Sequence, residues 1–236
     1  PSIYKPGALK SMKLGGNGVF GASTDVGFGF KFEADNGFGF ASNVVDKNAD
    51  AAAGGLLGDD SVRKWDTQLA YTTDNWHLSA TLSDAQNWES QSYNATTLGL
   101  MRGAAGTSAA GDTTGYAFRG YWMPEESGTA APEISVGYDI MSADNPASGA
   151  GKEADSYFVG LTWKDMFQAD DRIGLAFTQP LKQTECNGTC SSTEVDPFVW
   201  EAYYAFKPND SMEVRPAVFG GSDVKADTAD DIFGVL

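Results

Sequence analysis

The stretch VGFGFKFE, residues 26–33, decides the fold of this chain. Val26 and three phenylalanines occupy every second position, and glycine, lysine and glutamate fill the positions between them. Successive side chains of a β-strand point to opposite faces, so this spacing predicts a strand with one large apolar face and one small or polar face. Asp35-Asn36-Gly37 follows, and Asn-Gly suits the positive φ angles of a tight turn. The stretch therefore predicts the first strand of a β-hairpin.

The same alternation recurs along the whole chain, and helical periodicity is nearly absent. The segments that show it, about eleven in all, are residues 26–33, 38–44, 65–71, 76–82, 116–122, 134–140, 157–163, 172–177, 198–206, 212–218 and 231–236. Pro216 falls inside one of these segments and cannot donate a ladder hydrogen bond, so we expect a bulge or an early strand end there. The pattern predicts an all-β chain whose strands run up and down in one antiparallel sheet.

The connections between these segments alternate in length. Short turns are expected near residues 35–37, 73–75, 123–132, 164–171 and 207–211. Long polar links are expected near residues 46–62, 83–113, 142–155, 183–196 and 220–230. A strict alternation places turns at one end of the sheet and loops at the other, as in transmembrane β-barrels. A two-sheet sandwich would mix the two lengths.

The two faces of the predicted strands differ in a way that suits two environments. The large face could be the core of a soluble sandwich or the lipid contact of a membrane barrel, and the small polar face would then meet solvent or a watery lumen. Several aromatic residues lie at or near strand ends, where an interfacial girdle belongs: Trp65, Trp76, Tyr116, Trp122, Tyr157, Trp163 and Phe206. Aromatic residues also favour strands in general, but their position favours the membrane barrel.

Composition excludes several classes of protein. The chain has 236 residues and a net charge of -16, and such an acidic chain is not expected to bind nucleic acid. No apolar run approaches the ~18 residues that a membrane-spanning helix needs, although barrel strands need no such run. The last segment is shorter than the ~9–11 residues of a spanning strand. We therefore expect residues 1–236 to be a portion of one larger barrel domain.

Charged residues on the small face are the candidates for lining a pore. A charge that faces lipid near the membrane midplane costs about 2–4 kcal/mol for Arg or Lys, and none of these residues falls on the large face. The pore-lining candidates are Lys31, Glu33, Asp66, His77, Arg119, Asp139, Arg172, Glu201, Glu213 and Arg215. Acids and bases roughly balance on this face, so the excess negative charge is expected in the loops and would favour cations at low salt.

The sequence offers no catalytic, cofactor or metal signature. Cys186 and Cys190 are the only cysteines, and a short loop disulfide in an oxidising compartment suits them better than a metal site or free thiols. Residues 16–21 match GxGxxG, but no strand precedes the motif and no helix follows it. Acidic pairs such as Asp170-Asp171 lack calcium-loop spacing and are expected to be solvated. His77 is the only histidine, and no nucleophile motif accompanies it, so an enzyme is not expected.

Several stretches resemble the cyanobacterial outer-membrane porins, which are related to the carbohydrate-selective OprB-type porins. The resemblance rests on PSIYKPGAL at residues 1–9, TDVGFGF at 24–30 with NGFGF at 36–40, and MEVRPAVF at 212–219. It implies a barrel of roughly sixteen strands, of which this chain holds the C-terminal portion. It also implies a bacterial outer-membrane location, contact with lipid and lipopolysaccharide, a homotrimer, and passage of small hydrophilic solutes and inorganic ions, iron included.

Three hypotheses follow from the sequence. The first is a passive porin. The second is a structural or surface-receptor barrel whose permeability is incidental. The third is a soluble β-sandwich that binds carbohydrate, which would stay dispersed without detergent.

Overall fold

The structure is a computed structural model that describes residues 26–46, 49, 58–87, 112–144, 148, 151–189, 196–223 and 231–236. Its elements are β1 (Val26–Glu33), β2 (Phe38–Asp46), β3 (Arg63–Thr72), β4 (Trp76–Gln86), β5 (Thr113–Trp122), β6 (Glu133–Ala143), β7 (Gly151–Lys164), β8 (Arg172–Cys186), β9 (Phe198–Asn209), β10 (Met212–Val214), β11 (Ala217–Ser222) and β12 (Ile232–Val235). Within the described residues every regular element is a strand. The all-β prediction is confirmed.

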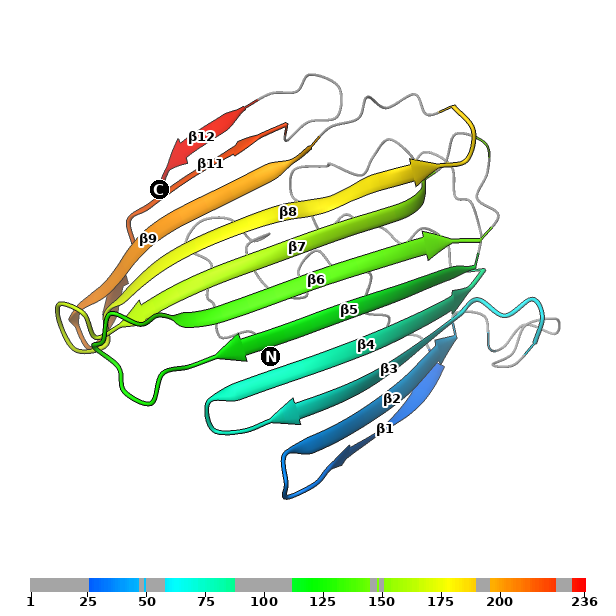
Figure 1. The fold of residues 1–236 in the computed structure, drawn as a ribbon, viewed down its shortest axis with the longest axis horizontal. Coiled ribbons are helices and arrows are strands. Elements are labelled where there is room, and N and C mark those ends of the chain that lie inside the picture. Colours follow the sequence, from blue (N-terminus) through cyan, green and yellow to red (C-terminus); the bar gives the residue numbers. More distant parts are fainter. Residues whose placement is uncertain are drawn as a thin grey trace.

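The strands form one antiparallel up-and-down sheet (Figure 1). Each strand pairs with its neighbour in sequence from β1 to β9, and the path continues through β11 to β12. The short β10 lies off this path and pairs with β9. In the described part of the chain, β1 and β12 are the two edges, so the sheet is open there. The path thus contains the predicted succession of strands.

Hairpin chemistry is visible at the first turn. Gly37 adopts a φ of 87°, and a Cβ atom there would lie 2.0 Å from the carbonyl oxygen of Thr72 on the neighbouring hairpin. The amide of Phe38 donates to the side-chain oxygen of Asn36 at 3.1 Å. Only glycine fits this backbone conformation and this close approach without strain.

Pro216 ends one short strand before another begins. The chain separates into β10 and β11 around it, and the pairing of β10 with β9 shifts register between Met212 and Val214. The amide of Tyr204 donates to the Pro216 carbonyl oxygen at 3.1 Å, so the proline still serves as an acceptor. The predicted interruption is confirmed.

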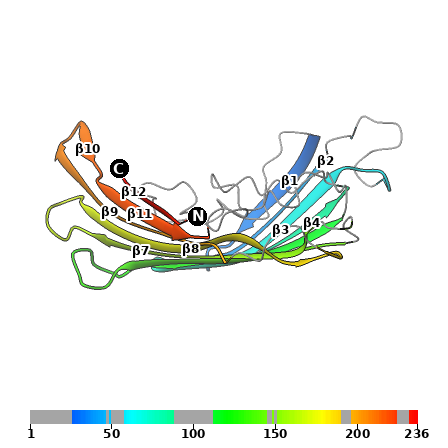
Figure 2. The ribbon, with the colours of Figure 1, turned by 90° about the horizontal axis from the view of Figure 1, so that it is seen from above.

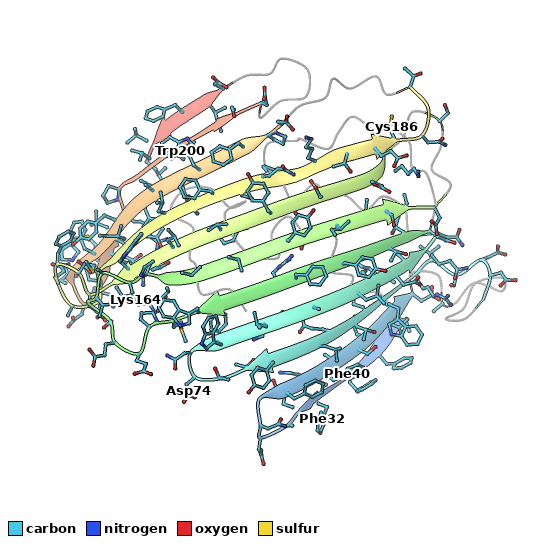
Figure 3. All side chains as sticks on the ribbon, viewed as in Figure 1. Phe32, Phe40, Asp74, Lys164, Cys186 and Trp200 are labelled. Carbon is cyan, nitrogen blue, oxygen red and sulfur yellow. The ribbon has the colours of Figure 1, made fainter. Side chains whose placement is uncertain are left out.

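Turns and links alternate, but less strictly than predicted. Strands β4, β7 and β8 extend beyond their predicted segments, because polar residues continue their ladders. The link between β6 and β7 therefore shrinks to residues 144–150, which is shorter than the connection 123–132 between β5 and β6. The strict alternation fails at this pair. The other short turns still lie at the end of the sheet that carries Asp74 and Lys164, opposite Cys186 (Figure 3).

The sheet curves into a trough (Figure 2), and its two faces are opposite in character. We call the face that carries Phe28, Leu78 and Phe118 the apolar face, and the face that carries Ser135 and Asp139 the polar face. On the apolar face large side chains are exposed, Phe28 by 64% and Leu78 by 57%. On the polar face small and charged side chains are buried, with Ser135 exposed by 1% and Asp139 by 3%. This is the reverse of a water-soluble sheet.

Among the residues that the structure describes, no helix has the length and apolar character needed to cross a membrane.

Candidate functional site

The polar face is the candidate site because strand register gathers the predicted charged residues on it. Asp66 pairs with Asn43 and Ser83, and Arg119 pairs with Ser79 and Gly137. Directly paired residues of antiparallel strands share a face. Followed from strand to strand, the register places eight candidates on this one face: Lys31, Glu33, Asp66, His77, Arg119, Asp139, Arg172 and Glu201. Their role in lining a pore remains a prediction.

The centre of the face holds a buried ion pair. Arg119 donates through Nη2 to Asp139 Oδ2 at 2.7 Å and through Nη1 to Oδ1 of the same carboxylate. The two side chains are exposed by 14% and 4%. A two-pronged Arg–carboxylate pair fixes both groups in one geometry. This pair therefore gives the middle of the wall two fixed charges of opposite sign.

A second charged cluster lies near the short-turn end. Arg172 Nη2 donates to Glu213 Oε2 at 2.7 Å, and Arg215 donates to the other oxygen of Glu213. The Arg215 guanidinium also lies over the ring of Tyr203, with Cζ 5.4 Å from the ring centroid. The two remaining candidates, Glu213 and Arg215, thus join Arg172 in one cluster. Sequence spacing alone did not predict this cluster because β10 is out of register.

His77 is held on the polar face without a catalytic partner among the described residues. Its Nδ1 lies 2.8 Å from the Thr72 hydroxyl, and its ring stacks on Tyr121 with a centroid distance of 5.3 Å. The side chain is buried. These contacts fit a structural histidine in the wall of the sheet.

The other candidates differ in exposure. Lys31 and Glu33 form an exposed ion pair of 2.6 Å on the edge strand β1. Glu201 is fully buried on β9, and Asp66 is half-buried on β3. The candidate side chains of the polar face therefore range from exposed, on the edge strand β1, to fully buried, on β9.

Three further charged residues of the polar face are not among the sequence-predicted candidates. Lys64 is buried two positions before Asp66, and Glu133 forms an ion pair with Lys164 across β6 and β7. Each lies at the end of its strand, just outside the predicted segment or at its margin. The period-two alternation of each strand places these residues on the polar face, which was a usable signal. The predicted segments were too short to include them.

The acidic pair Asp170-Asp171 was predicted to be solvated, and for Asp171 this is wrong. Its side chain is fully buried and accepts hydrogen bonds from the backbone of the β7–β8 turn. The physical reason is that a turn buries carboxylates that replace its missing backbone partners. Asp170 next to it is exposed and pairs with Lys207 at 3.3 Å.

Cys186 ends β8 at the end of the sheet with the long links and is disulfide-bonded (Figure 3). Cys190 is outside the described residues, so its pairing with Cys186 stays a prediction. Residues 1–25, which carry part of the family resemblance, are also outside them. In the described ranges, no group of three or more His, Cys, Asp or Glu side chains is arranged to hold a metal ion.

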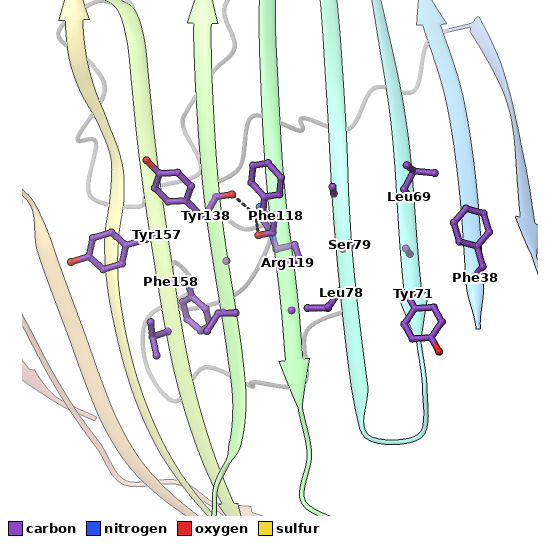
Figure 4. A pocket seen from close by; sticks show the side chains of 16 residues that line it. Phe38, Leu69, Tyr71, Leu78, Ser79, Phe118, Arg119, Tyr138, Tyr157 and Phe158 are labelled. Atoms are coloured by element: carbon purple, nitrogen blue, oxygen red, sulfur yellow. Dashed lines mark hydrogen bonds between the residues drawn. The ribbon is translucent and has the colours of Figure 1, made fainter. Parts of the chain in front are cut away.

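The apolar face has a shallow groove of about 570 Å³ (Figure 4). Phe38, Leu69, Leu78, Phe118 and Tyr157 are among the residues that line it. Its floor is at Gly120, where the nearest atom to an added Cβ would be Leu78 Cδ2 at 3.1 Å. Most of the lining is apolar, and Tyr71, Tyr138 and Tyr157 are among its few residues with a polar group. The polar face, which gathers the charged side chains, therefore remains the better candidate for solute contact.

Comparison with known proteins supports the fold. No family model and no curated protein matches the chain. Among solved structures, the sheet is similar to one described as Salmonella typhi OmpF in complex with daunomycin. The TM-score is 0.53 and the sequence identity 12%, and the match covers 82% of this chain and 53% of that chain. The chain thus spans about half the length of that protein, and at this identity the likeness shows the fold alone.

Proposed function

We propose that this chain is the C-terminal portion of an outer-membrane porin, a passive channel for small hydrophilic solutes and inorganic ions. The observation that carries the proposal is the reversed polarity of the sheet: large apolar side chains are exposed and charged side chains are buried. Water-soluble proteins rarely expose so continuous an apolar surface. A lipid-facing outer wall and a hydrated inner wall explain both faces at once.

The charges of the polar face support a general diffusion channel. The pairs Arg119–Asp139, Glu133–Lys164 and Arg172–Glu213 each combine one positive and one negative group. A wall of balanced charge hydrates an aqueous path without holding one ion tightly. The similarity to the fold of OmpF supports the same reading, while the solute remains part of the proposal.

The finer assignments rest on the sequence resemblance. We infer that the protein lies in the outer membrane of a cyanobacterium, contacts lipid and lipopolysaccharide there, and forms a homotrimer. No catalytic function is proposed, because the described polar face pairs its charged groups with one another rather than with a nucleophile.

The decisive experiment is planar-bilayer conductance of the intact parent protein. Stable ohmic steps are expected, with weak selectivity in a salt gradient. The matched variants are Asp139→Asn, which leaves Arg119 without its partner charge in the wall, and Asp170→Asn, which changes an exposed turn carboxylate. Only Asp139→Asn is expected to change the single-channel conductance. Folded protein that never conducts would overturn the proposal and favour a structural or receptor barrel.

A further inference from the structure

Two Asn-Gly dipeptides lie within the described residues, and the structure places them in opposite environments. Asn36-Gly37 forms the first hairpin turn, whereas Asn187-Gly188 follows Cys186, the last residue of β8. An asparagine before glycine is prone to lose its side-chain amide, because glycine has no Cβ atom to hinder attack by its backbone nitrogen on the asparagine side chain. What holds each glycine amide therefore decides whether the reaction occurs in the folded protein.

The turn at Asn36 is held by hydrogen bonds at both groups that would react. The amide of Gly37, which would attack, donates to the Ala34 carbonyl oxygen at 3.0 Å. The side-chain oxygen of Asn36 accepts from the Phe38 amide at 3.1 Å. The Gly37 carbonyl oxygen also accepts from the amide of Thr72 at 2.8 Å, which ties the turn to the next hairpin. This turn must therefore open before the Gly37 nitrogen can meet the side chain of Asn36.

The backbone at Gly188 lies beyond the strand end and lacks this restraint. Asn187 and Gly188 are both exposed, and Gly188 has a φ of 86°. In the described part of the chain, no hydrogen-bond acceptor faces the Gly188 amide. A Cβ atom added to Gly188 would have Ser148 Oγ, at 3.3 Å, as its nearest described neighbour. The Gly188 nitrogen can therefore reach the side chain of Asn187 without any opening of the sheet.

We propose that Asn187 is a site of spontaneous deamidation in the folded protein. The Gly188 amide gives its proton to water, and its nitrogen attacks Cγ of Asn187. A new C–N bond closes a succinimide ring while the bond from Cγ to the side-chain nitrogen breaks, and that nitrogen takes up a proton and leaves as ammonia. Water then opens the ring at either carbonyl carbon and gives aspartate or isoaspartate. The reaction consumes one water molecule in net terms, and the site does not depend on the proposed channel.

The product carries a new negative charge at the end of the sheet that bears Cys186 (Figure 3). Glu185 nearby is exposed and pairs with Lys152 at 2.7 Å. A carboxylate at position 187 competes only weakly for that ammonium group, because exposed ion pairs contribute little. Strand β8 ends at Cys186, so the longer backbone of isoaspartate lies outside the ladder. Deamidation is therefore expected to change the surface charge and to leave the strand pairing intact.

The test is peptide mass spectrometry of the intact parent protein, folded in nonionic detergent and incubated at mildly alkaline pH in heavy-oxygen water. The label enters when water opens the succinimide ring, so it marks the reaction during the incubation. The Asn187 peptide is expected to take up the label at least about tenfold faster than the Asn36 peptide, because the turn at Asn36 must open first. In urea, where no turn is held, the two peptides should be labelled at similar rates.

Asn187→Gln is the matched variant. Its side chain keeps the amide but is longer by one methylene group, which disfavours ring closure, so labelling of this peptide should be lost while that of Asn36 stays unchanged. Circular dichroism of each sample checks that the β-structure is retained. Equal labelling of Asn187 and Asn36 in the folded protein would overturn the proposal. An Asn187 peptide that is labelled in urea but not in the folded protein would overturn it as well.

Discussion

Asp171 organises the β7–β8 turn through its own side chain. The amide of Met166 donates to Oδ1 at 2.8 Å, and those of Phe167 and Gln168 donate to Oδ2 at 3.0 and 3.1 Å. The Tyr204 hydroxyl adds a bond of 2.9 Å from β9. The carboxylate thus replaces partners that a turn backbone lacks, and it ties the turn to the neighbouring strand.

Replacing Asp171 by asparagine should destabilise the sheet. The amide nitrogen would face donors in place of an acceptor, so we expect the free energy of unfolding to fall by about 2–3 kcal/mol. The control is Asp170→Asn, which breaks only an exposed pair with Lys207 and should cost less than about 0.5 kcal/mol. Urea unfolding of the refolded protein in micelles measures both. Equal midpoints for the two variants would contradict this role of Asp171.

The lowered pKa of Asp171 predicts that the stability of the protein depends on pH. Desolvation is the largest single effect and raises the pKa of Asp171, but the hydrogen bonds from Met166, Phe167, Tyr204 and Gln168 together outweigh it and lower the pKa. A lowered folded-state pKa means that the stabilisation is fully present above the usual Asp value near ~4 and is lost as pH falls through the folded value. The stability gap between wild type and Asp171→Asn should therefore be constant at neutral pH and shrink below about pH 4. A gap that is unchanged in acid would rule out the charged carboxylate as its source.

Gly174 provides space for a neighbouring aromatic ring. A Cβ atom at this position would lie 2.1 Å from Cε1 of Tyr203, whose side chain is buried. We expect Gly174→Ala to cost about 1–3 kcal/mol, because the ring must shift within a packed face. Gly39→Ala is the control, since its nearest contact would be Ala70 Cβ at 3.7 Å. In a Tyr203→Ala background the penalty at Gly174 should vanish, and a penalty that persists there would point to the backbone instead.

Along a strand, the face to which a side chain points decides whether its position tolerates a charge. Leu69 is 50% exposed on the apolar face of β3, and Gln68 next to it lies on the polar face and donates to Thr81 at 2.9 Å. In lipid, Leu69→Arg should lower the free energy of unfolding by about 2–4 kcal/mol, whereas Gln68→Arg should lower it by less than about 1 kcal/mol. Unfolding from lipid vesicles measures both values. Equal penalties would show that the apolar face does not contact lipid.

The face on which each strand residue lies was predictable from the sequence, whereas the positions of the strand ends were not. Phe28 and Phe30 alternate with glycines, so their face follows from the period of two alone. The last residues of β4, Ser83 to Gln86, are polar or small and look like a loop, yet Ser83 to Ala85 continue the ladder to β5. Local composition cannot reveal pairing with a strand far along the chain, which is why these boundaries were missed.

Two prolines also show that the sequence alone does not reveal where a strand ends. Pro216 lies at a predicted interruption, and the structure ends β10 before it. Pro180, in contrast, lies inside β8, where the register with β7 shifts between Asp155 and Tyr157. The ladder accommodates the missing amide at this irregularity. The sequence predicts that a proline disturbs a strand, but whether the strand ends or bulges depends on its neighbours.

The candidate site was predictable only in part for a related reason. Arg119 and Asp139 were both assigned to the polar face, but their pairing depends on the register of β5 with β6. A polar pocket of about 740 Å³, lined in part by the connection 123–132, could not be predicted, because connections carry no periodic pattern. Its acids were visible in the sequence, yet their convergence with Asp74 and Asp165 comes from three separate turns.

For the whole molecule, the open sheet restricts how a pore can form. In the described part of the chain, β1 and β12 each leave one edge without a partner strand. Unpaired backbone groups are not tolerated in the hydrocarbon layer, so a lipid-embedded sheet must close through further strands. The match to about half of the OmpF structure agrees with this requirement. Conductance is therefore expected only of the longer protein of which we propose this chain to be a portion.

The charge of the whole chain predicts how such a pore selects ions. The net charge is -16, while the polar face pairs its charges, so we expect the excess acid on the connections, at the mouths of the proposed channel. Screening shortens the reach of these charges from about 10 Å at 0.1 M salt to about 3 Å at 1 M. The reversal potential in a potassium chloride gradient should therefore favour potassium at low salt and approach zero preference at high salt. A preference that persists at 1 M would place the selecting charges inside the narrow lumen, and Asp139 and Glu201 would then be the carboxylates to neutralise.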